Sequence, residues 1–201
     1  MQTRTKGRYG RSRALMGIML LSAAIGTAAG ITAYFFALPQ RPGQLEQLGI
    51  AYLHAGGPSS VFLDSFCVSS VFILCEFLLG FCSLGQPLEV AVPAVFGLGS
   101  GVVMCAVCSQ IALPQGLAII VPAALSSVAA AAAVSAAACE SVKLSSRLMS
   151  HVMSPLASDG MLDTVRLYCG RAFAAEVLCA LSAALRALAV YLVKVSFHPF
   201  I

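Results

Sequence analysis

Long apolar runs separated by short polar connections dominate the pattern of hydrophobic and polar positions along the chain. A bilayer core of roughly 30 Å needs about 20 apolar residues in a helix. Because backbone that crosses hydrocarbon must satisfy its own hydrogen bonds, runs of this length favour helices over barrel strands. The pattern predicts an all-α, polytopic transmembrane helix bundle that forms a single integral membrane domain over residues 1–201. Its five membrane-spanning helices are expected at 14–38, 61–82, 88–111, 115–139 and 172–195.

The connections between these runs differ in character. Segment 39–60 is rich in glycine and proline, which indicates a loop. Segment 140–171 carries apolar residues at helical spacing. This spacing is typical either of interfacial helices on the membrane surface or of an extension of the fourth helix. Alanine permits close helix contact, so the Ala-rich fourth run is expected in the middle of the bundle.

The distribution of lysine and arginine predicts how the bundle is oriented. Five of these residues precede the first apolar run, four lie in segment 140–171, and one lies in segment 39–60. With five spans, the arm and segment 140–171 share one side, which carries nine basic residues (five and four) against one. Since such residues favour the cytoplasm, we expect an N-in, C-out protein with loop 39–60 outside and connection 140–171 in the cytoplasm. The first run is too long for a signal-peptide core and is expected to remain as a helix.

Composition supports the membrane class and argues against a nucleic-acid-binding role. Hydrophobic residues make up 59% of the chain and charged residues only 10%. A soluble domain usually carries about a quarter charged residues, so a soluble catalytic domain is not expected. The formal net charge of +4 comes mostly from the N-terminal arm. Because that arm abuts an uncharged apolar run, a topology signal is favoured over binding to nucleic acid.

The residues that could carry chemistry do not assemble into a catalytic, cofactor or metal site in the sequence. Cys105 and Cys108 have the spacing of metal and redox sites, but no second such pair or His/Cys cluster accompanies them. Ser100 lies between glycines, yet all three histidines fall outside the predicted spans. A nucleophile needs an adjacent base. We therefore expect no enzyme activity, no cofactor and no bound metal.

Charged residues inside the predicted spans are costly and are the default functional candidates. Glu89 is expected at a helix end near the interface, where its charge is tolerated. Glu76, Glu176 and Arg186 remain within spans, and Arg186 is nearest to mid-depth. Internal pairing of Arg186 with Asp64 or Glu76 is the structural interpretation. A transport path is the alternative, although it would usually show more polar residues converging at mid-membrane.

Glycines in the third run predict a close helix contact. Gly97 and Gly101 form a Gly-x3-Gly pattern, which lets two backbones approach each other. The expected contact is with another helix of the bundle. A contact with a partner protein is the alternative.

One stretch of the chain has the spacing of a known family. It contains Ser65-Phe66 and Leu79-Gly80, followed by a set of glycines and a proline at Gly85, Pro87, Gly97 and Gly101. This stretch resembles the stage II sporulation protein M family of endospore-forming Firmicutes. In that family the second helix ends in a similar Gly-x4-Gly-x-Pro turn, and the third helix carries a Gly-x3-Gly at a matching offset. Gly170-Arg171, expected to open the last helix, is also similar.

The resemblance implies a function for the whole chain. A member of this family would be a non-enzymatic scaffold in the cell membrane, at the sporulation septum and the engulfing mother-cell membrane. It would organise stage II sporulation proteins D and P, which degrade septal peptidoglycan. Its five motif positions, Gly80, Gly85, Pro87, Gly97 and Gly101, would serve turns and helix packing. The alternatives are a small-molecule permease or permease subunit and, less favoured, an intramembrane enzyme.

Overall fold

The described part of the chain is entirely helical. The structure, a computed structural model, describes residues 2–37, 57–82, 86–110, 115–153 and 161–197. Within these ranges there are five α-helices and no strand: α1 (Gln2–Ala37), α3 (Pro58–Leu79), α4 (Gln86–Gln110), α5 (Gln115–Met153) and α6 (Met161–Phe197). Each of the five contains a stretch long and apolar enough to cross a membrane. The all-α transmembrane bundle expected from the sequence is confirmed.

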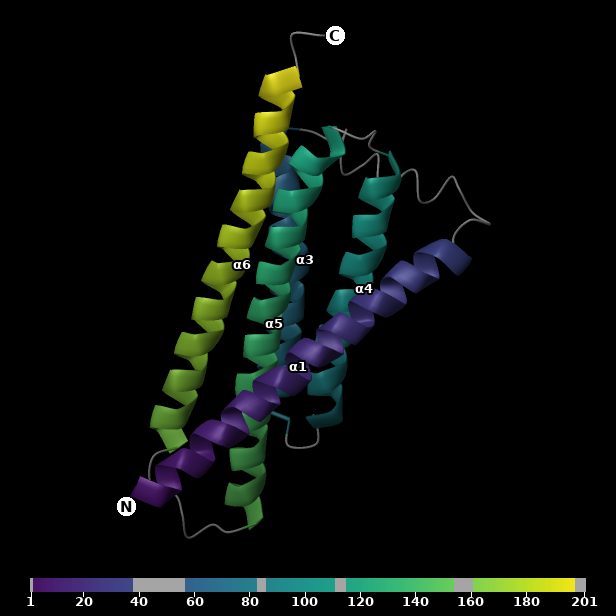
Figure 1. Cartoon of the computed structure of the whole chain (residues 1–201). Coiled ribbons are helices and arrows are strands. Elements are labelled where there is room, and N and C mark those ends of the chain that lie inside the picture. The colour runs from purple at the N-terminus through teal and green to yellow at the C-terminus, as the bar shows by residue number, and fades with distance from the viewer. Residues whose placement is uncertain (1, 38–56, 83–85, 111–114, 154–160, 198–201) are drawn as a thin grey trace.

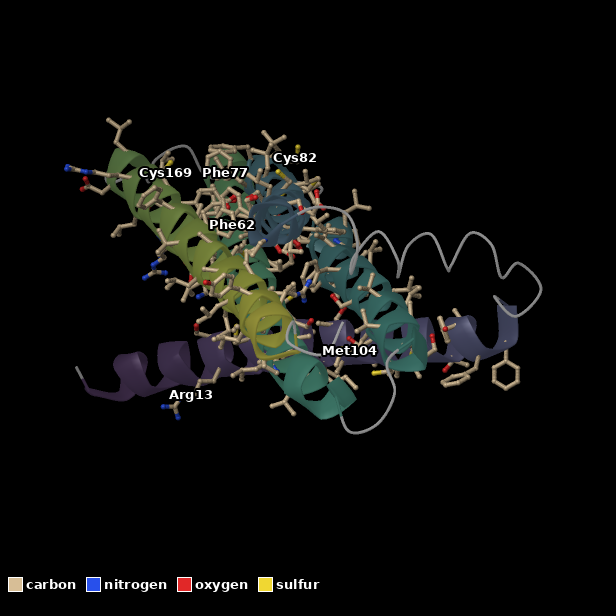
Figure 2. All side chains as sticks on the ribbon, turned by 90° about the horizontal axis from the view of Figure 1, so that it is seen from above. Arg13, Phe62, Phe77, Cys82, Met104 and Cys169 are labelled. Carbon is tan, nitrogen blue, oxygen red and sulfur yellow. The ribbon has the colours of Figure 1, made fainter. Side chains whose placement is uncertain are left out.

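Four of the helices run alternately up and down, and the fifth crosses them. In Figure 1, α3, α4, α5 and α6 lie side by side, while α1 passes obliquely over one face of the bundle. The start of α1 and the end of α6 lie at opposite ends of the bundle. Figure 2 shows α1 along one side of the bundle and α3 on the opposite side.

Helix α5 is the central element of the bundle. It packs against each of the other four helices, and its small side chains Ala133, Val134 and Ala138 are fully buried. Alanine leaves room for neighbouring backbones, so four helices can approach α5 closely. The middle position expected for the Ala-rich run is confirmed.

The outward faces of the helices are apolar. Phe36, Val128 and Phe173 are 80%, 67% and 71% exposed, respectively, and many leucines share this outward position. A soluble monomer rarely exposes apolar surface on this scale, because contact of that surface with water is unfavourable. Together with the helix lengths, this surface indicates a lipid environment for the bundle.

Three helices are longer than the sequence analysis expects. Helix α1 begins at Gln2 rather than at 14. Helix α5 continues to Met153, and α6 begins at Met161 rather than at 172. The interfacial-helix interpretation of segment 140–171 is therefore wrong for residues 140–153, and the extension of the preceding helix is correct. Pro155, which disfavours helix before it, is the first strong breaker after Pro122. Gly170 lies inside α6 instead of opening it.

Several expected connections lie outside the described residues. Most of loop 39–60 falls in residues 38–56, and the turns fall in 83–85 and 111–114. At the start of α3, Pro58 occupies the first turn, where its missing N–H costs no helical hydrogen bond. At the end of α3, the N–H of Gly80 donates to the main-chain oxygen of Glu76 at 3.0 Å.

Membrane orientation is a prediction that the fold makes easy to test. Ser150, near the end of α5, lies at the same end of the bundle as the start of α1, and Ser59 opens α3 at the other end. In a cysteine-free background, Ser59→Cys is expected to react with an impermeant thiol reagent added to intact cells. Ser150→Cys is expected to react only after permeabilisation, because basic residues are retained in the cytoplasm. The reverse labelling pattern would refute the N-in, C-out topology.

Candidate functional site

Gly97 and Gly101 lie in the contact between α4 and α1. A methyl group at Gly97 would overlap the main-chain oxygen of Ala23, and one at Gly101 would overlap that of Thr27. Only hydrogen atoms fit between these backbones. The structure thus places both glycines where the Gly-x3-Gly pattern predicts a neighbouring helix.

The partner helix carries a matching pair of glycines. Gly26 and Gly30 on α1 face the main-chain oxygens of Ala94 and Leu98, again with no room for a Cβ atom. Their spacing is the same Gly-x3-Gly pattern, and the sequence analysis missed it although the signal was present. Gly99, between the two α4 glycines, has nothing within 4 Å of its Cβ position. The close contact is therefore specific to one face of each helix.

Gly80 lies at a second close contact, at the end of α3. A Cβ atom there would overlap the hydroxyl of Tyr168 and come within 3.0 Å of Ser141 Oγ. Pro87 is exposed in the first turn of α4, where a proline is tolerated. Gly85 lies outside the described residues.

Four helices contribute buried polar side chains to a group next to Gly80. We name this group the carboxylate cluster, and it consists of Glu76 (α3), Glu89 (α4), Ser141 (α5) and Tyr168 (α6). Ser141 Oγ lies 2.8 Å from the main-chain oxygen of Glu76 and 3.0 Å from Oε1 of Glu89. The Tyr168 hydroxyl donates toward the main-chain oxygens of Phe77 at 3.0 Å and Glu76 at 3.2 Å. These contacts join all four helices at one point.

The carboxylates of this cluster are buried and largely without partners. Glu76 and Glu89 are both 0% exposed. Within the described part of the chain, both carboxylate oxygens of Glu76 and Oε2 of Glu89 accept no hydrogen bond. A buried polar group without a partner costs free energy, and an uncompensated buried charge costs several kcal/mol. Such an arrangement can accept a proton or a small cation.

The burial of Glu89 corrects an expectation from the sequence. Glu89 is near the start of α4, so counting residues places it at the interface, where a charge is tolerated. It is instead fully buried, and Ser141 of α5 donates a hydrogen bond to its Oε1. The position of a residue along its own helix does not reveal which residues of neighbouring helices bury its side chain.

Arg186 lies in a separate polar group nearer the other end of the bundle. Its Nε donates to Ser126 Oγ at 3.0 Å, and a terminal nitrogen donates to Ser127 Oγ at 2.6 Å. The other terminal nitrogen lies 3.4 Å from Ser65 Oγ on α3. A guanidinium carries five N–H donors in a plane, so it can bridge hydroxyls from two helices. The adjacent serines in the Ala-rich run were the sequence signal for this contact.

The structure tests one of the two acidic partners predicted for Arg186. Pairing with Glu76 is wrong, because neither carboxylate oxygen of Glu76 accepts a hydrogen bond from any residue that the structure describes, Arg186 included. Pairing with Asp64 stays a prediction. Glu176, the other carboxylate inside a predicted span, accepts a hydrogen bond from Ser70 Oγ at 2.8 Å. The polar groups within the bundle are thus distributed over several depths.

Metal binding by clustered side chains has no support in the described residues. Among them, no group of three or more histidine, cysteine, aspartate or glutamate side chains gathers in a way that could hold a metal ion. The carboxylate cluster contains two carboxylates and two hydroxyls, which is a poor ligand set for a transition metal.

The helix bundle, its apolar outer surface and its interior contacts define a polytopic α-helical membrane protein. No protein-family model, curated protein or solved structure matches the chain.

Proposed function

We propose that this chain is a non-enzymatic membrane scaffold of the sporulation engulfment machinery. It organises stage II sporulation proteins D and P, which degrade septal peptidoglycan, during forespore engulfment. The proposal places it in the cell membrane at the septum and the engulfing membrane. It rests on the resemblance of Ser65–Gly101 to the stage II sporulation protein M family.

One structural observation supports this proposal more than any other. Three of the motif positions that carry the resemblance, Gly80, Gly97 and Gly101, are the points where helices approach too closely for a side chain. The motif thus specifies the relative placement of α1, α3, α4 and α6. A scaffold needs a bundle of fixed shape that presents the same surface to its partners each time.

The proposal is tested by complementation in an endospore-forming bacterium that lacks its stage II sporulation protein M. The chain is expected to restore migration of the engulfing membrane and to co-purify with proteins D and P after crosslinking. Gly97→Leu should abolish both, and Gly99→Leu should retain both. Normal accumulation of the chain at the membrane without any restoration would contradict the proposal.

A small-molecule permease is the second candidate, and the carboxylate cluster is the observation that favours it. Ionisable side chains inside a membrane bundle commonly mark proton or substrate pathways. Glu76 and Glu89 are such side chains, and three of their oxygens lack hydrogen-bond partners among the described residues.

The two candidates differ in what the carboxylates must do. For a scaffold, Glu76→Gln and Glu89→Gln should leave engulfment intact, and proteoliposomes should show no substrate or proton flux. A permease should show flux that both substitutions reduce. Flux in the wild-type chain that disappears in both variants would replace the scaffold proposal with the permease.

A further inference from the structure

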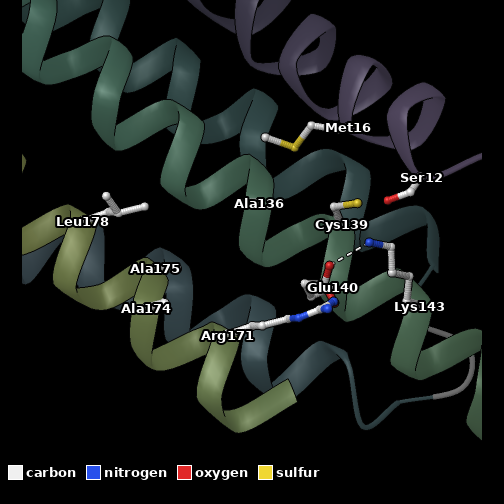
Figure 3. A pocket seen from close by; sticks show the side chains of 10 residues that line it. All are labelled: Ser12, Met16, Ala136, Cys139, Glu140, Lys143, Arg171, Ala174, Ala175 and Leu178. Carbon is white, nitrogen blue, oxygen red and sulfur yellow. Dashed lines mark hydrogen bonds and ion pairs between the residues drawn. The ribbon is translucent and has the colours of Figure 1, made fainter. Parts of the chain in front are cut away.

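A cavity opens between α1, α5 and α6 at the end of the bundle where α1 begins. Its volume is about 300 Å³. In the close view of Figure 3, charged side chains lie at one end of the cavity and apolar side chains at the other. The charged end is formed by Glu140, Lys143 and Arg171, and the apolar end includes Leu178.

The charged end of this cavity lies near the level at which α3 ends. Ser145, two residues beyond Lys143, donates to the main-chain oxygen of Cys82 at 2.9 Å, just past the last residue of α3. Helix α5 continues from there to Met153, which at 1.5 Å per residue adds roughly 12 Å. The cavity's charges are therefore close to the level at which α3 ends, while α5 and α6 extend past them, and we place the lipid head groups at this level.

The apolar end continues into the region where acyl chains lie. Met16 of α1 lines it together with Ala136 of α5 and Leu178 of α6, which lie one or two helical turns from the charged residues of their own helices. Leu178 is half exposed on the outside of the bundle. A ligand with a polar head and an apolar tail fits this order of side chains.

The charges of the cavity favour an anionic head group. Glu140 pairs with both Lys143 and Arg171, so two cations and one anion leave a net positive charge. The side chain of Arg171 is 56% exposed and that of Lys143 is 34% exposed, whereas Glu140 is only 20% exposed. An incoming phosphate would meet the cations first. Each cation has more N–H donors than its bond to Glu140 uses.

We propose that this cavity is a binding site for one anionic phospholipid. The head-group phosphate contacts Lys143 and Arg171, and the first part of an acyl chain lies along Met16 and Leu178. Glu140 lies between the two cations of α5 and α6 and offsets part of their positive charge. Basic pockets between membrane helices on the cytoplasmic side are typical sites for anionic lipids. This inference is independent of the proposed scaffold function.

The test measures lipid binding to the full-length chain, purified in detergent and delipidated, by native mass spectrometry. Phosphatidylglycerol is the probe. Phosphatidylcholine with the same acyl chains tests the head-group charge, and glycerol 3-phosphate tests the phosphate without acyl chains. Phosphatidylglycerol is expected to bind about tenfold more tightly than either. Equal binding of phosphatidylcholine would overturn the proposal. Equal binding of glycerol 3-phosphate would indicate a site for a free anion and would also overturn it.

Charge variants strengthen this test, because removing the cations and removing the anion should change the affinity for phosphatidylglycerol in opposite directions. Lys143→Gln combined with Arg171→Gln should reduce phosphatidylglycerol affinity about tenfold. Glu140→Gln should increase it, since a negative charge leaves the site while both cations remain. Arg166→Gln, an exposed position on α6 outside the cavity lining, is the matched control and should change nothing. A loss of affinity in Glu140→Gln, or an equal loss in Arg166→Gln, would contradict the proposed geometry.

If the double variant fails to fold, a substitution at the apolar end of the cavity still tests the proposal. Ala174 lines the cavity and is exposed, so Ala174→Phe narrows the cavity without disturbing the core. It should reduce phosphatidylglycerol binding and leave glycerol 3-phosphate binding unchanged. Unchanged phosphatidylglycerol binding in Ala174→Phe would show that the lipid does not occupy the cavity.

Discussion

Replacing Gly97 or Gly101 with leucine is expected to separate α1 from α4 and to destabilise the bundle by about 3 kcal/mol. At both positions the obstacle is main-chain oxygen of α1, which cannot rotate away as a side chain can. A leucine at either position therefore forces whole helices apart. The measurement is the melting temperature of the purified chain in detergent, followed by circular dichroism and gel filtration.

Gly99 provides a matched control on the same helix. It lies between the two contact glycines and has nothing within 4 Å of its Cβ position, so Gly99→Leu changes the same residue type without a clash. We expect a melting temperature close to that of the wild-type chain. If Gly99→Leu were as damaging as Gly97→Leu, the loss would come from helix flexibility or lipid contact, and the proposed α1–α4 contact would be wrong.

Replacing Glu76 with methionine is expected to raise the melting temperature of the bundle, with a gain of about 1–3 kcal/mol. Glu76 is fully buried, and in the part of the chain that the structure describes neither of its carboxylate oxygens has a hydrogen-bond partner. Methionine has a similar length and no polar atoms in its side chain that need a strong partner, so the desolvation cost disappears while the packing is retained. A clear loss of stability would show that the carboxylate has a favourable partner in the folded protein.

Glu176→Met is the control for this substitution. Glu176 accepts a hydrogen bond from Ser70, so removal of its carboxylate leaves that hydroxyl without its acceptor. No stabilisation is expected there. A similar gain in both variants would show that any loss of charge stabilises the bundle, and the specific account of Glu76 would fail.

A stabilising substitution at a functional position commonly costs activity. For that reason Glu76→Met also separates the two candidate functions. A scaffold should still support engulfment, whereas a permease that uses the carboxylate should lose flux.

The number and type of the helices could be predicted from the sequence, but the exact lengths of α1, α5 and α6 could not. Long apolar runs specify membrane helices because hydrocarbon allows almost no other backbone structure. The boundary near residue 140 was ambiguous because polar residues appear there without any helix breaker. Residues 140–153 are helical in the structure, and the first strong breaker after them is Pro155.

Sequence reasoning could predict only some of the residues of the site. The Gly-x3-Gly pattern at Gly97 indicated a close contact, since a glycine pair of that spacing lies on one helix face. The pattern could not identify α1 as the partner, and the equivalent pair that begins at Gly26 was missed. Glu89 was placed at the interface by its distance from a helix end, although packing buries it completely.

The sequence by itself determined that this chain is a bundle of membrane helices, because the hydrophobic effect and backbone hydrogen bonding act on local runs of residues. Only the tertiary structure decided which polar side chains meet. The convergence of Glu76, Glu89, Ser141 and Tyr168 depends on how four helices are placed relative to one another. Pairing across helices separated by 52 to 92 residues leaves no periodic signal in the sequence, since each side chain occupies an ordinary position on its own helix.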